Sequence, residues 1–270
     1  MLVVQNTYFQ IFGLTIRYFG AFLALGLLAS FLSFFYSSSK RLGLSGEVTV
    51  ELASIATIAG VIGAHCAYLI EGYGWQAMSL CGFLFTRVDG LSVLGALVTV
   101  PLTLFIWARF QRVSFFALMD ALCIAAPLFD FFGRLGCLFG GCCYGLPSKW
   151  CSVMYLDARV PAPAFIHLFP VQLVAALLFL TLFFVLFLIR RYLDKKGENI
   201  PGLFLALYFF SAAFIRFCLD FLRGDRADAA LEVGQSFITN YQFGCLAVCL
   251  VAVVTLGGIL WKKYSKVEAS

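Results

Sequence analysis

The chain has 270 residues, of which 62% are apolar and 12% are charged, and it contains 31 phenylalanines. Soluble proteins carry about 25% charged residues, so this composition excludes an ordinary soluble enzyme and indicates an integral membrane protein. The net charge of +5 does not indicate nucleic-acid binding, because the basic residues fall in predicted loops and leave no exposed basic stripe.

Seven apolar stretches are long enough to cross a hydrocarbon core of about 30 Å, which takes about 20 helical residues. In chain order they cover residues 14–36, 48–70, 91–109, 115–132, 170–189, 202–222 and 236–261. Short turn-forming or charged segments separate them, and no internal repeat is visible. The sequence therefore predicts an all-α, polytopic membrane protein with about seven transmembrane helices in a single domain, residues 1–270.

The lysines and arginines predict the orientation, since short cytoplasmic loops retain them. One side of the membrane receives most of them: Lys40, Arg41, Arg109, Arg112, Arg190, Arg191, Lys195, Lys196, Lys262, Lys263 and Lys266. The N-terminus is therefore predicted outside and the C-terminus in the cytoplasm. No cleavable signal peptide is expected, because no basic region precedes the first apolar stretch.

The most unusual segment is residues 133–145, which follows the fourth apolar stretch and reads Gly-Arg-Leu-Gly-Cys-Leu-Phe-Gly-Gly-Cys-Cys-Tyr-Gly. Backbone that faces lipid cannot leave its amides unpaired, so a glycine-rich break is tolerated only where it is buried in protein or lines a wet cavity. The segment is predicted to be irregular and to mark a site that includes Arg134.

Charged residues inside apolar stretches are candidates for function, because each costs about 2.5–3.5 kcal/mol at a helix centre on insertion scales. Arg216 and Asp220 are four residues apart, which places them on one helix face as an ion pair. The spacing leaves open whether this pair serves catalysis or only tethers helices. Asp130 is close enough in sequence to orient Arg134.

The sequence offers few groups for acid–base or metal chemistry, and no metal or cofactor is predicted. The two histidines, His65 and His167, are far apart in the chain. The C-x4-C-C spacing of the thiols in residues 133–145 differs from the C-x2-C pairs of structural zinc sites. Three alternatives stay open for these thiols: a zinc site with a histidine, a disulfide to Cys151 or Cys81, and plain packing in a tight turn.

Several short motifs follow one another in a fixed order along nearly the whole chain. They are Ile16-Arg17-Tyr18-Phe19-Gly20, Gly63-Ala64-His65-Cys66-Ala67-Tyr68, Asp89-Gly90-Leu91-Ser92, Asp120 with Ala126-Pro127, Gly133-Arg134-Leu135-Gly136, Pro170-Val171-Gln172-Leu173, Gly202-Leu203-Phe204, and residues 216–223. In this order they resemble the bacterial prolipoprotein diacylglyceryl transferases. These are multi-pass plasma-membrane enzymes that load a lipid onto the cysteine of lipoprotein precursors.

The resemblance implies an enzyme of lipoprotein biosynthesis, in the bacterial plasma (inner) membrane, that transfers a diacylglyceryl group from phosphatidylglycerol to a thiol acceptor. It implies no cofactor. The predicted catalytic residues are Arg134, Arg216, Asp220, Cys137, Cys142 and Cys143. The predicted substrate-binding residues are Arg134, Arg216, Gly136, Gly141, Gln172 and Arg223. A planar guanidinium suits a phosphate headgroup because it stays charged and binds two oxygens at once.

The chain also departs from the family pattern, chiefly where protons are handled. Leu94 occupies the position of the family's catalytic histidine, and Cys137, Gly140 and Cys142 occupy those of its signature asparagines and glutamate. Either the arginines alone activate the acceptor thiol, or one of the cysteines acts as a nucleophile. Two alternative functions therefore stay open: a cysteine-dependent paralogue that uses another acceptor or handles sulfur or metal, and a catalytically silent lipid-binding protein.

Overall fold

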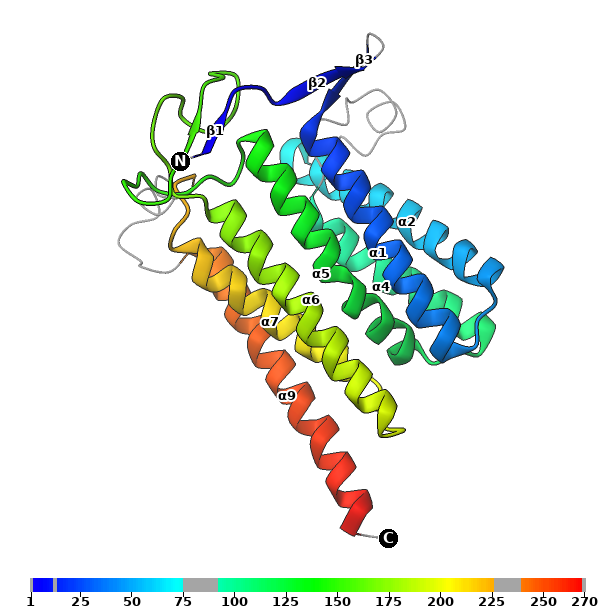
Figure 1. Cartoon of the computed structure of the whole chain (residues 1–270). Helices are drawn as coiled ribbons and strands as arrows, with labels where there is room; N and C mark the ends of the chain where they lie inside the picture. The colour runs from blue at the N-terminus through cyan, green and yellow to red at the C-terminus, as the bar shows by residue number, and fades with distance from the viewer. Residues whose placement is uncertain (1, 12–13, 75–91, 226–238, 269–270) are drawn as a thin grey trace. The chain divides into compact units, whose positions relative to one another are not determined.

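The structure is a computed structural model that describes residues 2–11, 14–74, 92–225 and 239–268 (Figure 1). Its long helices are α1 (Tyr18–Leu42), α2 (Gly46–Tyr73), α4 (Val93–Gln111), α5 (Phe115–Gly140), α6 (Val171–Lys195), α7 (Leu203–Asp220) and α9 (Asn240–Glu268). All seven are long and apolar enough to cross a membrane. The predicted polytopic helical fold is confirmed, and the orientation of the termini stays a prediction.

Several helix ends lie some residues away from their predicted positions, and two of these differences bear on the site. The first helix begins at Tyr18, because residues 14–17 form strand β3 (Leu14–Arg17), which pairs antiparallel with β2 (Tyr8–Ile11). The fourth helix does not end at residue 132 but continues through the glycine-rich segment to Gly140. Arg134 therefore lies on a helix and not on an irregular break.

The reason for this longer helix is the close approach of α1 to α5. A Cβ on Gly136 would lie 3.2 Å from Cδ2 of Phe19, so the glycine makes room for the phenylalanine ring. Nearby, the rings of Phe22 and Phe139 stack with centroids 5.3 Å apart. A helix also satisfies its own amides, which a membrane segment requires. Gly136 therefore serves helix packing.

The chain forms two compact units, one of residues 1–33 and 122–270 and the other of residues 34–121. In the second unit α2 and α4 approach closely where glycine faces glycine, since a Cβ on Gly95 would overlap the carbonyl oxygen of Gly63. The Ser92 hydroxyl, one residue before α4, donates to Glu71 of α2 at 2.8 Å. The prediction of a single domain stays untested.

In the first unit, apolar side chains of α5, α6 and α7 form the core between the helices. The buried members are Ile124, Phe179, Leu182, Leu186, Leu193, Leu203 and Phe204. At the far end of α6 the buried Arg190 pairs with Asp194 at 3.0 Å and lies over the Phe204 ring. Burial of apolar side chains thus holds α6 against α5 and α7, the two helices that carry Arg134 and Arg216.

A small extramembrane layer covers the other end of α5 and α6. Strand β1 (Leu2–Val4) pairs parallel with β4 (Val153–Tyr155), with Leu2 opposite Val153, and Figure 1 shows both over these helix ends. Their side chains share a core with the last turn of α5, made of Val4, Leu138, Val153, Tyr155, Ala162 and Leu168. The layer therefore packs directly on the segment that carries the thiols.

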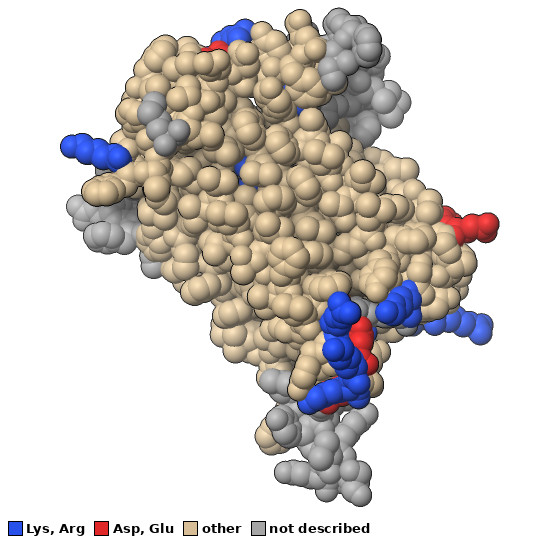
Figure 2. All heavy atoms as spheres, in the orientation of Figure 1, with Lys and Arg blue, Asp and Glu red and all other residues tan. Residues whose placement is uncertain are grey.

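Charged side chains are sparse along the helices on the face that Figure 2 draws. Lysine and arginine gather near the end of α6, whose last residues include Arg190, Arg191 and Lys195. Hydroxyl groups on the helix sides donate to the carbonyl one turn earlier, as Thr181 does to Leu177 at 2.8 Å. This surface is suited to lipid, because its polar groups are satisfied within the helix.

We expect Gly95→Ala to lower the free energy of unfolding by about 1–3 kcal/mol, because the added methyl group forces α2 and α4 apart. Thermal unfolding in detergent micelles, followed by circular dichroism, measures the change. Gly72→Ala is the matched control, since a Cβ there meets no atom within 4 Å. Equal melting temperatures for the two variants would contradict the close packing at Gly95.

Candidate functional site

A cavity in the first unit lies between α5, α6, α7 and the two loops next to them. The space in the cavity and at its mouth that no atom occupies amounts to about 310 Å³, part of which is open to solvent. Its lining residues are Arg134, Cys143, Val171, Gln172, Ala175, Phe179, Ile215, Arg216, Leu219 and Arg223. Five residues predicted from the sequence, Arg134, Cys143, Gln172, Arg216 and Arg223, are thus brought together by helices distant in the chain.

The three arginines of the cavity differ in the acidic side chains with which they interact. Arg223 follows α7 and donates from Nε and Nη2 to the carboxylate of Asp225, at 2.9 and 2.5 Å. Arg216 of α7 lies 4.0 Å from Asp220, which accepts a hydrogen bond from Thr239 at 3.0 Å. The predicted Arg216–Asp220 pair is therefore present, at the outer limit of an ion pair.

Arg134 lies on α5 and is half-buried. Its guanidinium interacts electrostatically with the Asp130 carboxylate one turn earlier, as predicted. Asp130 also accepts a hydrogen bond of 2.7 Å from the Tyr208 hydroxyl on α7. This hydrogen bond therefore links α7 to the face of α5 that carries Asp130 and Arg134. Nothing in the sequence indicated this tyrosine partner, because it is 78 positions away from Asp130.

Two polar atoms beside the cavity are buried without a hydrogen-bond partner among the described residues. They are Oε1 of Gln172, a residue that is 1% exposed, and Nη1 of Arg223, which is 7% exposed. A buried donor or acceptor left unpaired costs about 1–3 kcal/mol. Because both residues line the cavity, an anionic ligand with hydroxyl groups would satisfy both atoms.

The thiols are positioned by the way α5 ends. Gly141 adopts a left-handed conformation with φ 70°, and the Cys142 amide donates back to the Cys137 carbonyl at 3.2 Å. This is the six-to-one hydrogen bond of a Schellman turn. A Cβ on Gly141 would lie 2.7 Å from Cβ of Val160. Gly141, predicted to bind substrate, therefore shapes the turn.

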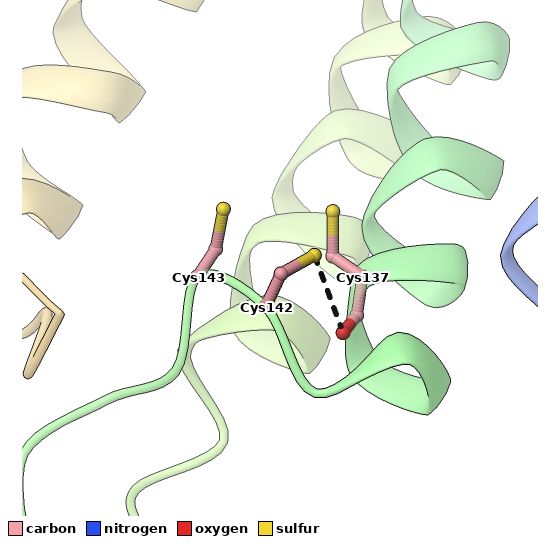
Figure 3. A group of neighbouring side chains, drawn as sticks. All are labelled: Cys137, Cys142 and Cys143. Atoms are coloured by element: carbon pink, nitrogen blue, oxygen red, sulfur yellow. Dashed lines mark hydrogen bonds between the residues drawn. The ribbon is translucent and has the colours of Figure 1, made fainter. Parts of the chain in front are cut away.

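The turn brings three thiols together. The Sγ atoms of Cys137, Cys142 and Cys143 all lie within 4.8 Å of one another (Figure 3). Cys143 has a left-handed φ of 54°, unusual for a residue with a side chain. None of the described cysteines, Cys151 among them, forms a disulfide, while Cys81 lies outside the described residues. Among the described cysteines, the disulfide alternative is wrong.

The two loop thiols have opposite pKa shifts. Hydrogen bonds from Cys137 and Cys142, and then the charges of Arg223 and Arg134, lower the pKa of Cys143. Hydrogen bonding with Cys137 and Cys143 raises the pKa of Cys142. Of the two, Cys143, which lines the cavity, is therefore the thiol that loses its proton more readily.

A buried polar network that the sequence did not reveal holds the loop. The Tyr155 hydroxyl of β4 donates to the Leu138 carbonyl at 2.8 Å. The Gln172 amide donates to the Cys142 carbonyl at 2.9 Å and to the Tyr155 hydroxyl at 3.3 Å. Burial raises the pKa of Tyr155, so its hydroxyl keeps its proton. Gln172 therefore positions the thiol loop as well as lining the cavity.

The remaining residues of interest are not among those that line the cavity. Gly136 packs against Phe19 and is not among the cavity residues. Leu94 is exposed on the first turn of α4 and His65 is buried in α2, both in the second unit. His167 contacts Ser152 at 3.0 Å in the segment between α5 and α6. Neither histidine is among the residues grouped with the three thiols.

The helices and the cavity define a class: a polytopic membrane protein with a cavity lined by three arginines. A sequence model of the prolipoprotein diacylglyceryl transferase family matches residues 6–259. The chain belongs to this family, whose members are transferases.

Three relatives illustrate the similarity, each named phosphatidylglycerol–prolipoprotein diacylglyceryl transferase. The protein of Clostridium tetani is 29% identical over 86% of this chain and 91% of its own length. That of Dehalococcoides mccartyi strain 195 is 29% identical over 91% and 92%. That of Chlorobaculum tepidum is 28% identical over 94% and 89%. The family resemblance seen in the motifs is confirmed.

We expect Tyr155→Phe to lower the free energy of unfolding by about 1–3 kcal/mol, because it leaves the buried Leu138 carbonyl without its donor. Unfolding by sodium dodecyl sulfate in mixed micelles measures the loss. Tyr36→Phe is the control, since that hydroxyl is exposed and accepts only a surface contact from Lys40. If both variants are as stable as the parent, the network does not hold the loop.

Proposed function

We propose that the chain transfers the diacylglyceryl group of phosphatidylglycerol to the cysteine thiol of a lipoprotein precursor, in the bacterial plasma membrane. The observation that carries the proposal is the convergence of Arg134, Arg216 and Arg223 on one cavity. Family membership and the names of the relatives support the same donor and acceptor.

The donor half of the reaction needs a site for a phosphodiester. When the bond between the diacylglyceryl carbon and its oxygen breaks, glycerol phosphate leaves and the phosphate gains negative charge. Positive groups already in place stabilise that charge without reorganising. Arg134 and Arg216 are proposed to hold the phosphate oxygens, with Asp220 orienting Arg216.

The headgroup is proposed to be oriented by the two buried polar atoms that have no partner among the described residues. Nη1 of Arg223 is a buried donor and suits a phosphate oxygen, while Oε1 of Gln172 is a buried acceptor and suits a hydroxyl group. The headgroup of phosphatidylglycerol offers both. The apolar lining of the cavity, such as Phe179 of α6 and Leu219 of α7, suits the glycerol carbons and the start of the acyl chains.

The proposed depth in the membrane follows from α6. Gln172 is near its first residue, while the basic residues from Arg190 onward are about 27 Å away at 1.5 Å per residue. If the basic end is cytoplasmic, the cavity lies near the outer leaflet. Lipoprotein precursors present their cysteine on that side after export.

The acceptor half needs a thiolate, and a free cysteine has a pKa of about 8.5. Leu94 cannot take a proton, so another group must favour the thiolate. A covalent lipid intermediate on Cys143 is chemically unfavourable, because it would be a thioether, and a second thiolate would have to displace an alkyl thiolate from carbon. We therefore propose that the cysteines activate the acceptor thiol without carrying the lipid.

Growth of a bacterial strain depleted of its own transferase tests the function. We expect plasmid-borne expression of this chain to restore growth and to produce lipoproteins with the mass of a diacylglyceryl group on the cysteine. Failure to restore either one, with the protein present in the membrane, would remove this proposal in favour of another acceptor or a silent lipid-binding role.

We expect Arg134→Ala and Arg216→Ala each to lower kcat by about 10²–10³-fold, equivalent to about 2.7–4 kcal/mol, through lost stabilisation of the leaving phosphate. Transfer from phosphatidylglycerol vesicles to a lipoprotein-signal peptide measures kcat. Arg159→Ala is the control, since Arg159 is exposed and pairs with Asp157 in the outer loop. Unchanged turnover in both cavity variants would contradict the phosphate site.

A further inference from the structure

We propose that Cys137, Cys142 and Cys143 hold one Zn²⁺ ion whose fourth coordination position binds the acceptor cysteine as a thiolate. This inference rests on the proposed function, because it takes a thiol as the acceptor. It assigns to this chain a means of thiol activation that requires neither a histidine nor a covalent lipid intermediate.

The geometry of the thiols fits a metal ion. In a tetrahedral site with Zn–S bonds of about 2.3 Å, neighbouring sulfurs are about 3.8 Å apart. The three Sγ atoms already lie within 4.8 Å of one another. Small rotations about χ1 would shorten these distances by about 1 Å, which is enough for all three sulfurs to coordinate one ion. Figure 3 shows the three side chains grouped at the end of α5.

The backbone holds this arrangement without help from an ion. The Schellman turn at Gly141 fixes Cys142 relative to Cys137, and the left-handed residue Cys143 directs its thiol back toward the helix end. Strained conformations of this kind persist where the surrounding structure enforces them, often at functional sites. Gln172 and Tyr155 bond to the backbone of the same loop, the role that outer-shell groups have in metal sites.

The number and kind of ligands indicate an open zinc site. Within the described chain, the group contains three thiols and no fourth histidine, cysteine or carboxylate. Soft thiolates favour Zn²⁺ and Cu⁺ over hard cations. Structural zinc sites use four protein ligands, whereas catalytic ones use three and leave a position for water or substrate. Three half-buried thiols therefore match a site that takes a substrate ligand.

The electrostatic surroundings support the same assignment. Three thiolates and Zn²⁺ together carry one negative charge, and the guanidinium groups of Arg134 and Arg223 act electrostatically on Cys143. Cys143 lines the cavity with both arginines. The ion would therefore lie beside the proposed phosphate site, where a bound thiolate is within reach of the diacylglyceryl carbon.

The step balances without an oxidant or reductant. The acceptor thiol binds the ion and releases its proton to solvent. Its sulfur then attacks the sn-3 carbon of the diacylglyceryl group, the C–O bond to phosphate breaks, and glycerol phosphate leaves with the electron pair. The thioether product is a neutral and weak ligand, so it leaves the ion, which takes up the next thiol.

The first test measures metal binding apart from activity. Full-length protein in detergent is stripped of metal and titrated with Zn²⁺ or with Co²⁺, whose thiolate charge-transfer band reports sulfur ligands. We expect a single equivalent to bind, and the band to grow with a lipoprotein-signal peptide but not with its Cys→Ser form. The variant with Cys137, Cys142 and Cys143 changed to serine should lose binding. The same change at Cys66, Cys151 and Cys218 should not.

The second test measures lipid transfer by the zinc-loaded and metal-free protein. At pH 7 only about 3% of a free thiol is ionised, so we expect metal removal to slow transfer about 30-fold and Zn²⁺ to restore it. The rate of the metal-free protein should rise about tenfold per pH unit up to about pH 8.5, whereas that of the zinc form should stay nearly flat. Cys142→Ser serves as a milder variant if the triple variant does not fold.

The outcomes separate this inference from the proposed function. Full lipid transfer by metal-free protein would overturn the zinc site and leave the transferase intact. Metal and peptide binding without lipid transfer would support the site and contradict the phospholipid donor. Copper as Cu⁺ bound in place of Zn²⁺, or a disulfide between two of the three thiols in the purified protein, would overturn the inference.

Discussion

The turn that ends α5 is the constraint on which the candidate site depends. The hydrogen bond from the Cys142 amide to the Cys137 carbonyl closes the helix, and it needs a left-handed residue at Gly141. The same residue leaves room for Val160, which lies in the segment between α5 and α6. The turn thus ends the membrane helix with its carbonyl satisfied and places three thiols beside the arginine-lined cavity.

The cavity concentrates positive charge where burial makes it costly. Arg223 is almost fully buried, and its two hydrogen bonds to Asp225 offset part of the cost of desolvating it. Nη1 of Arg223 and Oε1 of Gln172 remain unpaired among the described residues. A site that retains such atoms is prepared for a ligand, and its chemistry matches the phosphate and hydroxyl groups of a phospholipid headgroup.

The thiols and the arginines are coupled through Gln172. Its amide nitrogen holds the Cys142 carbonyl and the Tyr155 hydroxyl, and its oxygen lies among the cavity residues. A change in headgroup position can therefore reach the thiol loop through one side chain. This coupling makes the donor and acceptor halves of the proposed reaction parts of one site.

Sequence reasoning was most successful for the helices, because about 20 consecutive apolar residues have few alternatives to a membrane helix. It was wrong about the glycine-rich segment, because Gly136 could equally mark a break or a close helix contact. Only the packing of Phe19 distinguishes the two. Sequence reasoning correctly paired Arg216 with Asp220, since that contact lies within one helical turn. It missed the roles of Tyr208 and Tyr155, because their hydrogen-bond partners are distant in the chain.

The sequence by itself determined that the chain crosses the membrane repeatedly, that it belongs among the diacylglyceryl transferases, and which arginines to consider. Hydropathy and the order of motifs are properties of the sequence alone, so they can be read without coordinates. Only the tertiary structure decided that Arg134, Arg216 and Arg223 share a cavity with Gln172, and that the three thiols meet. The shared cavity depends on the packing of α5, α6 and α7, which no single stretch of sequence specifies. The grouping of the thiols depends on the left-handed turn at Gly141, and coordinates are needed to see that the side chains on the two sides of this turn meet.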